Sequence, residues 1–189
     1  MNRRDALSRV ALLVGGSIVG AEFFLSGCNT GGPRAAGLPL SAEDIAYLDE
    51  IAETIIPTTN TPGAKEAKVG AFMNTMVMDC YEEKDHKIFL DGMAKLNEAC
   101  NKTTGSDFMK ASAEKRKEFL ITVDKEAKEY QKNKKPEDPA HYFSLMKQLT
   151  LLGYFTSEVG ATKALRYVAV PGKYEGCVPY KKGDKAWAT

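Results

Sequence analysis

The clearest pattern in the sequence is a helical spacing of apolar residues, which recurs in five stretches between Ser41 and Leu152. The first stretch begins at Ser41, where Ser-Ala-Glu-Asp is typical of a helix N-cap followed by acidic residues in the first turn. Pro57 ends it, because proline cannot continue a helix. The apolar positions of this stretch are Ile45, Leu48, Ala52 and Ile55.

The other four stretches repeat this spacing, and turn-rich or polar sequence separates them at 58–63, 101–107 and 132–139. Their apolar faces comprise Val69, Phe72, Met73, Met76, Val77 and Cys80; Phe89, Met93, Leu96 and Cys100; Phe119, Val123, Ala127 and Tyr130; and Tyr142, Leu145, Met146, Leu149 and Leu152. No segment shows sustained alternation of apolar and polar residues. We therefore predict an all-α fold, a bundle of about five helices followed by an irregular C-terminal segment.

Residues 1–28 have the pattern of an export signal. The paired arginines Arg3 and Arg4 precede an apolar run, Val10 to Val19, that is shorter than the roughly 20 residues needed to span a bilayer. Arg-Arg followed by Asp-Ala-Leu resembles a twin-arginine signal, which serves proteins exported in the folded state. The alternative is an ordinary secretory signal with two arginines by chance, but the position of the pair and the weakly apolar run favour the twin-arginine type.

The signal ends in Leu-Ser-Gly-Cys, which resembles the lipoprotein box of bacteria. Cleavage before Cys28 would free its thiol to carry a lipid, and more than one acyl chain gives stable anchoring. Gly, Pro and Ala dominate residues 29–38 and are typical of a flexible tether. We therefore expect a periplasmic, lipid-anchored protein. Its predicted parts are a signal peptide over 1–27, a lipidated tether over 28–40, and a helical domain over 41–189 that includes an interaction segment over 153–189.

The charge balance excludes a strongly basic footprint for nucleic acid, since the 189 residues include 26 Lys and Arg against 25 Asp and Glu. Removal of 1–27 would leave 162 residues with 23 basic and 23 acidic side chains. A chain of that length buries enough surface to fold without a metal or a disulfide.

The sequence lacks the common cofactor motifs. It contains no Cys-x-x-Cys-His for covalent haem, no Gly-x-Gly-x-x-Gly for a dinucleotide, no phosphate loop and no Gly-x-Ser-x-Gly elbow. Glu82 and His86 could share a helical face and chelate a metal, but a solvated helix end is the favoured interpretation of this charged stretch. The methionines at 73, 76 and 78 could bind a soft metal, although core packing is the simpler account.

Three cysteines remain besides Cys28. In an exported protein Cys80, Cys100 and Cys177 could form one disulfide and leave one thiol, and the sequence does not choose the pair. Cys80 and Cys100 lie on apolar helical faces and could instead be buried hydrophobic residues. Cys177 lies in an expected loop and is the more available partner for oxidation.

The C-terminal segment is rich in aromatic residues and turn formers. Gly160 is expected to break or bend the last helix, and Pro171-Gly172 favours a tight turn. Tyrosine and tryptophan in such a segment often anchor protein interfaces, but the segment could equally fold back to cap its own bundle. Both alternatives bury the same aromatic side chains, so the sequence does not distinguish between them.

Several of these features together resemble the gluconate 2-dehydrogenase subunit 3 family. They are the twin-arginine start, the helix from Asp49 that ends Ile55-Ile56-Pro57, Pro62-Gly63-Ala64 leading to Val69, Gly153-Tyr154-Phe155-Thr156-Ser157-Glu158, and Pro171-Gly172-Lys173-Tyr174-Glu175-Gly176-Cys177. The lipoprotein cysteine departs from the general pattern of that family.

The resemblance implies a non-catalytic accessory subunit with no cofactor of its own. Its partner would be a large flavoprotein of the glucose–methanol–choline type, which carries FAD and oxidises a sugar or gluconate. Electrons would pass to a cytochrome c or a quinone-linked acceptor. The small subunit would aid folding, stability, co-export and membrane attachment of the flavoprotein. The residues expected at the partner interface are Tyr154, Phe155, Glu158, Tyr167, Pro171, Tyr174, Cys177, Tyr180 and Trp187.

Two other functions compete with this interpretation. The first is a stand-alone enzyme that uses Glu158, His86 or a thiol, although no nucleophile–base pair can be assigned from spacing. The second is a lipid-anchored scaffold or binding protein unrelated to redox chemistry.

Overall fold

The computed structural model describes residues 40–173 and 175–188, and it confirms the predicted all-α fold. The α-helices are α2 (Ala42–Ile55), α3 (Val69–Thr75), α4 (Glu83–Thr104), α5 (Ala113–Asn133) and α6 (Tyr142–Thr156). The described residues also form three short helical turns, which are the π-helical η1 (Met76–Cys80) and η3 (Gly160–Ala164) and the 3₁₀-helical η2 (Phe108–Lys110). Arg3, Arg4, Cys28 and the expected signal peptide and tether lie outside the described residues.

Local sequence signals define the helix ends. Ser41 caps α2, since its Oγ accepts a hydrogen bond from the Asp44 N–H at 3.2 Å and its own N–H donates to the Asp44 carboxylate at 3.0 Å. Ser112 caps α5 by a single bond, since its Oγ accepts from the Lys115 N–H at 3.4 Å. Gly105 ends α4 in the left-handed region, at φ 76°, where a residue without Cβ has no steric cost.

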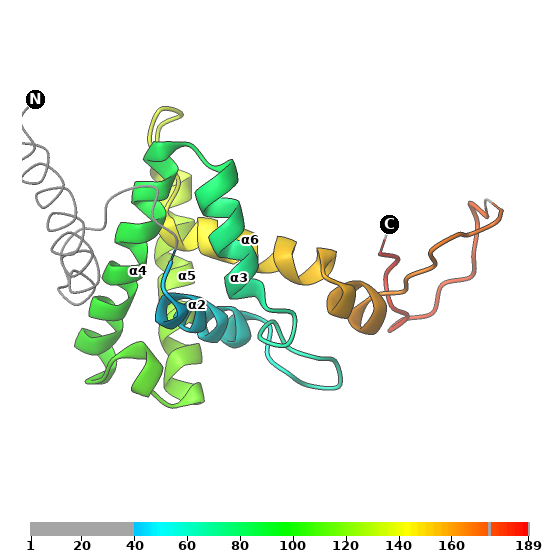
Figure 1. Cartoon of the computed structure of the whole chain (residues 1–189), viewed down its shortest axis with the longest axis horizontal. Helices are drawn as coiled ribbons and strands as arrows, with labels where there is room; N and C mark the ends of the chain where they lie inside the picture. The colour runs from blue at the N-terminus through cyan, green and yellow to red at the C-terminus, as the bar shows by residue number, and fades with distance from the viewer. Residues whose placement is uncertain (1–39, 174, 189) are drawn as a thin grey trace, which may run out of the picture. The chain divides into compact units, whose positions relative to one another are not determined.

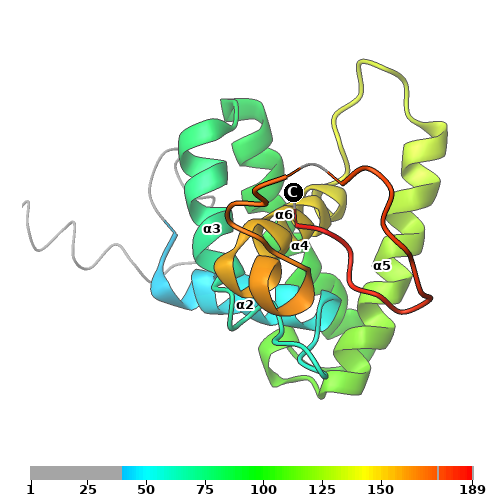
Figure 2. The same ribbon diagram turned by 90° about the vertical axis from the view of Figure 1, so that its right-hand side faces the viewer.

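Helix α6 is the centre of the bundle, because it contacts each of the other four α-helices. In Figure 1 α6 runs across the directions of α3, α4 and α5, and Figure 2 looks along it, with α3 and α5 on either side. Phe143, Met146 and Leu149 on this helix are buried. They pack in one continuous core with apolar residues of the other helices, including Leu48 and Ile51 of α2 and Phe89 and Leu96 of α4.

The core of α6 lies on a slightly different face from the predicted one. Leu152, expected in the core, is 43% exposed, while Phe143 and Thr150 are buried. The hydroxyl of Thr150 donates to the Met146 carbonyl oxygen at 2.8 Å, so a polar residue fits this position without an unsatisfied group. The apolar run over 142–155 allows more than one buried face, and packing against all four helices selects it.

Two further expectations need correction. Helix α4 continues through Thr104, although residues 101–107 were expected to form a break; Thr103 and Thr104 bond back to the carbonyl oxygens of Ala99 and Cys100 and so remain compatible with the helix. Cys80 is exposed rather than buried. It ends the π-helical turn η1, whose wider turns rotate its last residue off the buried face.

Candidate functional site

The C-terminal part of the chain, from the last turns of α6 onward, holds most of the large apolar side chains that the fold leaves exposed. Leu151, Leu152 and Phe155 are exposed on α6 itself. The exposed apolar and aromatic residues that follow are Tyr167, Val168, Val170, Val178, Tyr180 and Trp187. Exposed apolar residues gathered in one part of a chain are typical of an interaction site.

The chain turns sharply where α6 ends. The Ser157 hydroxyl donates to the Tyr154 carbonyl oxygen at 2.6 Å and accepts from the Gly160 N–H at 3.0 Å. A Cβ at Gly160 would collide with the Tyr154 carbonyl oxygen, so only glycine permits this close approach. The helix therefore breaks at Ser157 and not at Gly160 as predicted, because α6 ends at Thr156 and Gly160 is the first residue of the π-helical turn η3.

Tyr154 belongs to the core and not to the surface. Its side chain is 1% exposed, and its hydroxyl donates to the Pro62 carbonyl oxygen at 2.5 Å. This bond ties α6 to the Pro62-Gly63 loop that precedes α3. The expectation that Tyr154 touches a partner is therefore corrected: the residue positions the exposed end of α6 instead.

The other expected interface residues are accessible. Phe155, Glu158, Tyr167, Pro171, Cys177, Tyr180 and Trp187 are exposed, and Tyr174 lies outside the described residues. Tyr180 is 77% exposed and Trp187 is 48% exposed. The alternative in which the segment buries its aromatic residues against its own bundle therefore disagrees with the structure. Their role at an interface stays a prediction.

The C-terminal segment is nevertheless held together at its base. The Arg166 N–H donates to the Ala186 carbonyl oxygen at 2.8 Å, and the Ala188 N–H donates to the Arg166 carbonyl oxygen at 2.9 Å. The Arg166 guanidinium lies over the Trp187 ring, 4.7 Å from its centroid, in cation–π geometry. We name this arrangement the Arg166–Trp187 clasp. The sequence did not predict it, because no periodic pattern links the two residues.

The metal pair of Glu82 and His86, which was the less favoured alternative for this stretch, does not form. Glu82 pairs instead with Lys84, at 2.7 Å between Nζ and Oε2. His86 is buried, contrary to the solvated helix end expected for it, and its Nε2 has no hydrogen-bond partner among the residues that the structure describes. Among the described residues no group of three or more His, Cys, Asp or Glu side chains could hold a metal ion.

His141 caps α6, since its Nδ1 accepts from the Phe143 N–H at 3.2 Å.

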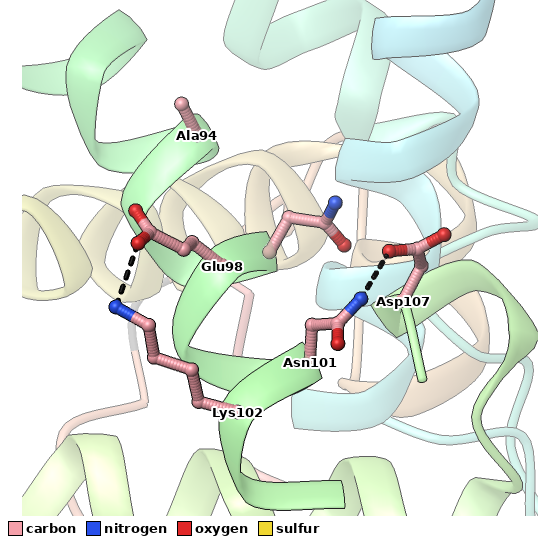
Figure 3. A pocket seen from close by; sticks show the side chains of 6 residues that line it. Ala94, Glu98, Asn101, Lys102 and Asp107 are labelled. Carbon is pink, nitrogen blue, oxygen red and sulfur yellow. Dashed lines mark hydrogen bonds and ion pairs between the residues drawn. The ribbon is translucent and has the colours of Figure 1, made fainter. Parts of the chain in front are cut away.

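A shallow hollow on α4 offers little binding chemistry. Figure 3 shows its lining residues, which are Ala94, Asn97, Glu98, Asn101, Lys102 and Asp107. Lys102 pairs with Glu98 at 2.6 Å, and the Asn101 amide donates to Asp107 at 2.9 Å. The Asn97 side chain accepts from the Phe108 N–H at 2.9 Å and so holds η2 against α4. The polar side chains of the hollow therefore bond to other groups of the protein, and we assign them a structural role and not a ligand-binding one.

The part of the chain that the structure describes contains neither a disulfide nor a membrane-spanning helix. Cys80, Cys100 and Cys177 are all free there, with Cys100 buried as expected. No helix between residues 40 and 188 is long and apolar enough to cross a membrane.

Comparison with known proteins identifies the family. No curated protein and no solved structure matches the chain. The family model for gluconate 2-dehydrogenase subunit 3 matches residues 42–172, from the first residue of α2 to the Pro171-Gly172 turn. The match includes the bundle, the α6–η3 junction and Arg166, while Cys177, Tyr180 and Trp187 follow it. This confirms the resemblance found in the sequence, and the chain belongs to the gluconate 2-dehydrogenase subunit 3 family.

Proposed function

We propose that this chain is the non-catalytic small subunit of an FAD-dependent dehydrogenase complex whose large subunit is a flavoprotein of the glucose–methanol–choline type. The family match carries the proposal, since it covers residues 42–172 and its family is named as a subunit of a dehydrogenase. The large subunit would hold FAD and oxidise a sugar or gluconate, and a cytochrome c or quinone-linked acceptor would receive the electrons.

The exposed end of α6 and the C-terminal segment are the proposed binding surface for the flavoprotein. Phe155, Tyr167 and Tyr180 are large aromatic side chains in contact with solvent, and aromatic residues of this kind dominate the energy of protein interfaces. The bundle has a continuous core and a central helix, α6, that contacts α2, α3, α4 and α5. Its role in the complex would be to present this surface and stabilise the folded flavoprotein.

Export and membrane attachment complete the proposal. Arg3 and Arg4 would direct the chain to the twin-arginine route, which accepts folded proteins, so that a bound flavoprotein could be exported with it. Lipidation of Cys28 would then hold the complex at the periplasmic face of a membrane.

A pull-down of the chain from its native membrane in mild detergent, followed by a visible absorption spectrum, tests the proposal. A large subunit that copurifies and shows a flavin spectrum is the expected result. A colourless monomer would contradict it and favour the lipid-anchored scaffold. A chain truncated after Thr162 should lose the flavoprotein, and complex formation by that truncated chain would exclude the C-terminal segment as the interface.

The export role has its own test. Replacing Arg3 and Arg4 by Lys should leave both subunits in the cytoplasm, as cell fractionation would show. Retention of the small subunit alone, with the flavoprotein still exported, would disprove the escort role and leave the subunit role intact.

A further inference from the structure

The charge of the chain is unevenly distributed along it. Residues 40–158, which form the helical bundle, carry 21 Asp and Glu against 16 Lys and Arg. Residues 159–188 carry 6 Lys and Arg against 2 Asp and Glu. A protein that is nearly neutral as a whole therefore has an acidic bundle and a basic C-terminal segment. The basic C-terminal segment therefore favours a partner surface that carries negative charge.

The two acidic side chains of the segment are already engaged locally. Glu175 pairs with Lys173 at 2.6 Å, and the Asp184 carboxylate accepts the Lys181 N–H at 2.9 Å. Lys181 and Lys182 have no ion-pair partner among the described residues, and both are exposed. These two lysines are therefore available to carboxylates supplied from outside the chain.

Apolar side chains lie in the same segment as these lysines. Val170 is 81% exposed, and Tyr180 directly precedes Lys181. Burying such side chains against a partner would release solvent and stabilise binding. The matching partner surface would carry acidic residues around an apolar patch, which is the usual anatomy of a protein interface.

The segment is also preformed at its base. The Arg166–Trp187 clasp joins the two ends of residues 167–186 through two backbone hydrogen bonds and one cation–π contact. The Lys185 ammonium additionally donates to the Lys163 carbonyl oxygen. Closing the base before binding reduces the conformational entropy that an open tail would lose when it docks.

We propose that residues 166–188, closed by the Arg166–Trp187 clasp, form a basic docking loop that binds an acidic, partly apolar surface of the large dehydrogenase subunit. The proposal rests on the proposed function and adds the chemistry of the partner surface. A protein partner fits better than a lipid surface because the chain belongs to a family of dehydrogenase subunits. Lys181 and Lys182 supply the electrostatic attraction, and the clasp holds the loop in its docking shape.

The electrostatic part is tested with a charge-matched pair of variants. In one full-length variant Lys181 and Lys182 become Gln; in the control, the exposed Lys117 and Lys125 of α5 become Gln. Titration calorimetry with the flavoprotein recovered in the wild-type pull-down should show about tenfold weaker binding for the first variant at low salt. The control should bind as the wild type does. Equal affinity of the two variants would overturn the proposal.

The clasp is tested by Arg166→Lys, which keeps the charge but loses the planar guanidinium that stacks on the ring. Trp187 is the single tryptophan of the chain, so its fluorescence in the isolated full-length protein reports the clasp directly. We expect increased quenching by acrylamide and a severalfold rise in Kd for the flavoprotein, since less of the loop is in its binding shape. Increased quenching with an unchanged Kd would show that the clasp is not needed for docking.

Three other outcomes separate this inference from the proposed function. A wild-type chain that recovers no flavoprotein would disprove the proposed function and, with it, the inference. A flavoprotein bound with the same affinity in low and high salt would overturn the inference and leave the function intact. The loop would have another occupant if the Lys181 and Lys182 substitutions left flavoprotein binding unchanged but weakened a different interaction. That interaction could be binding to vesicles of phosphatidylglycerol and phosphatidylcholine in equal parts, or self-association of the chain through its acidic bundle.

Discussion

Two neighbouring carboxylates on α2, Asp49 and Glu50, have pKa values shifted in opposite directions by their local contacts. Glu50 accepts hydrogen bonds from Lys65 and from Arg116, the latter at 2.5 Å, and thereby links α2 to α5. Burial alone would raise the pKa of Glu50, but the hydrogen bonds and charges of Lys65 and Arg116 outweigh burial and hold it below the usual value. For Asp49, burial dominates and raises the pKa, although the Gly70 N–H donates to its carboxylate at 2.7 Å.

The lowered pKa of Glu50 predicts a loss of stability in acid. A carboxylate with a lowered pKa stabilises the fold above its unfolded pKa, near 4.5, and this contribution is lost as the pH falls through the folded value. Glu50→Gln removes that contribution. We therefore expect the variant to be less stable than the wild type at pH 7 and closer to it at pH 3, as measured by urea unfolding. An equal difference at both pH values would contradict this.

For Asp49 we predict the opposite effect, a gain in stability at neutral pH when its charge is removed. Its raised pKa means that the ionised carboxylate disfavours the folded state at neutral pH, and this cost disappears below about pH 3.8, where it is protonated in both states. In Asp49→Asn the amide oxygen can still accept the Gly70 N–H. We expect up to about 1 kcal/mol of added stability at pH 7, and a smaller change at pH 3. A loss at pH 7 would show that the charge strengthens the Gly70 hydrogen bond more than burial opposes it.

At the scale of the elements, the crossing of α6 with α3 depends on Gly153. A Cβ placed there would lie 2.6 Å from Cδ1 of Phe72 and 3.1 Å from its Cε1 and Cγ, which is too close for ordinary packing. Alanine is the better helix former by about 1 kcal/mol, so Gly153→Ala would stabilise α6 if space were open. Because it is not, we expect a net loss of about 1–3 kcal/mol in the free energy of unfolding.

A second variant separates the steric cause from other effects of that substitution. Phe72→Leu removes the ring that the new methyl group would strike. In a double-mutant cycle measured by urea unfolding, the two changes together should therefore cost less than the sum of the single changes. Additive losses would mean that the steric conflict lies elsewhere in α6.

The sequence predicted those parts of the fold that depend on local signals. The Ser41 capping box, the stop at Pro57 and the helical faces of α4 and α5 follow from nearby residues. The burial of Tyr154 could not be predicted in this way, because its hydroxyl partner is the carbonyl of Pro62, 92 positions away. Cys80 was misplaced because a π-helical turn changes the period that the pattern assumes.

At the scale of the whole molecule, most candidate interface residues are exposed because the bundle completes its core without them. Among the described residues, the core extends from Leu40 to Tyr154, and of the segment that follows Tyr154 only Ala164 packs against it, partly buried. The sequence could place the aromatic residues in this segment but could not show that they remain exposed, since a fold-back would satisfy the same pattern. Folding and docking therefore depend on largely separate parts of the described chain.

This separation predicts that truncation after Thr162 leaves the bundle folded. The removed side chains are mostly exposed, so we expect a loss of at most about 1 kcal/mol, whereas removing the buried ring in Tyr154→Ala should cost about 3–5 kcal/mol. Thermal unfolding followed by circular dichroism measures both. If the truncated chain lost as much stability as Tyr154→Ala, the segment would be part of the core, and its loss of flavoprotein binding could be attributed to unfolding. A small shift in Tm would instead make that binding test specific for the docking surface.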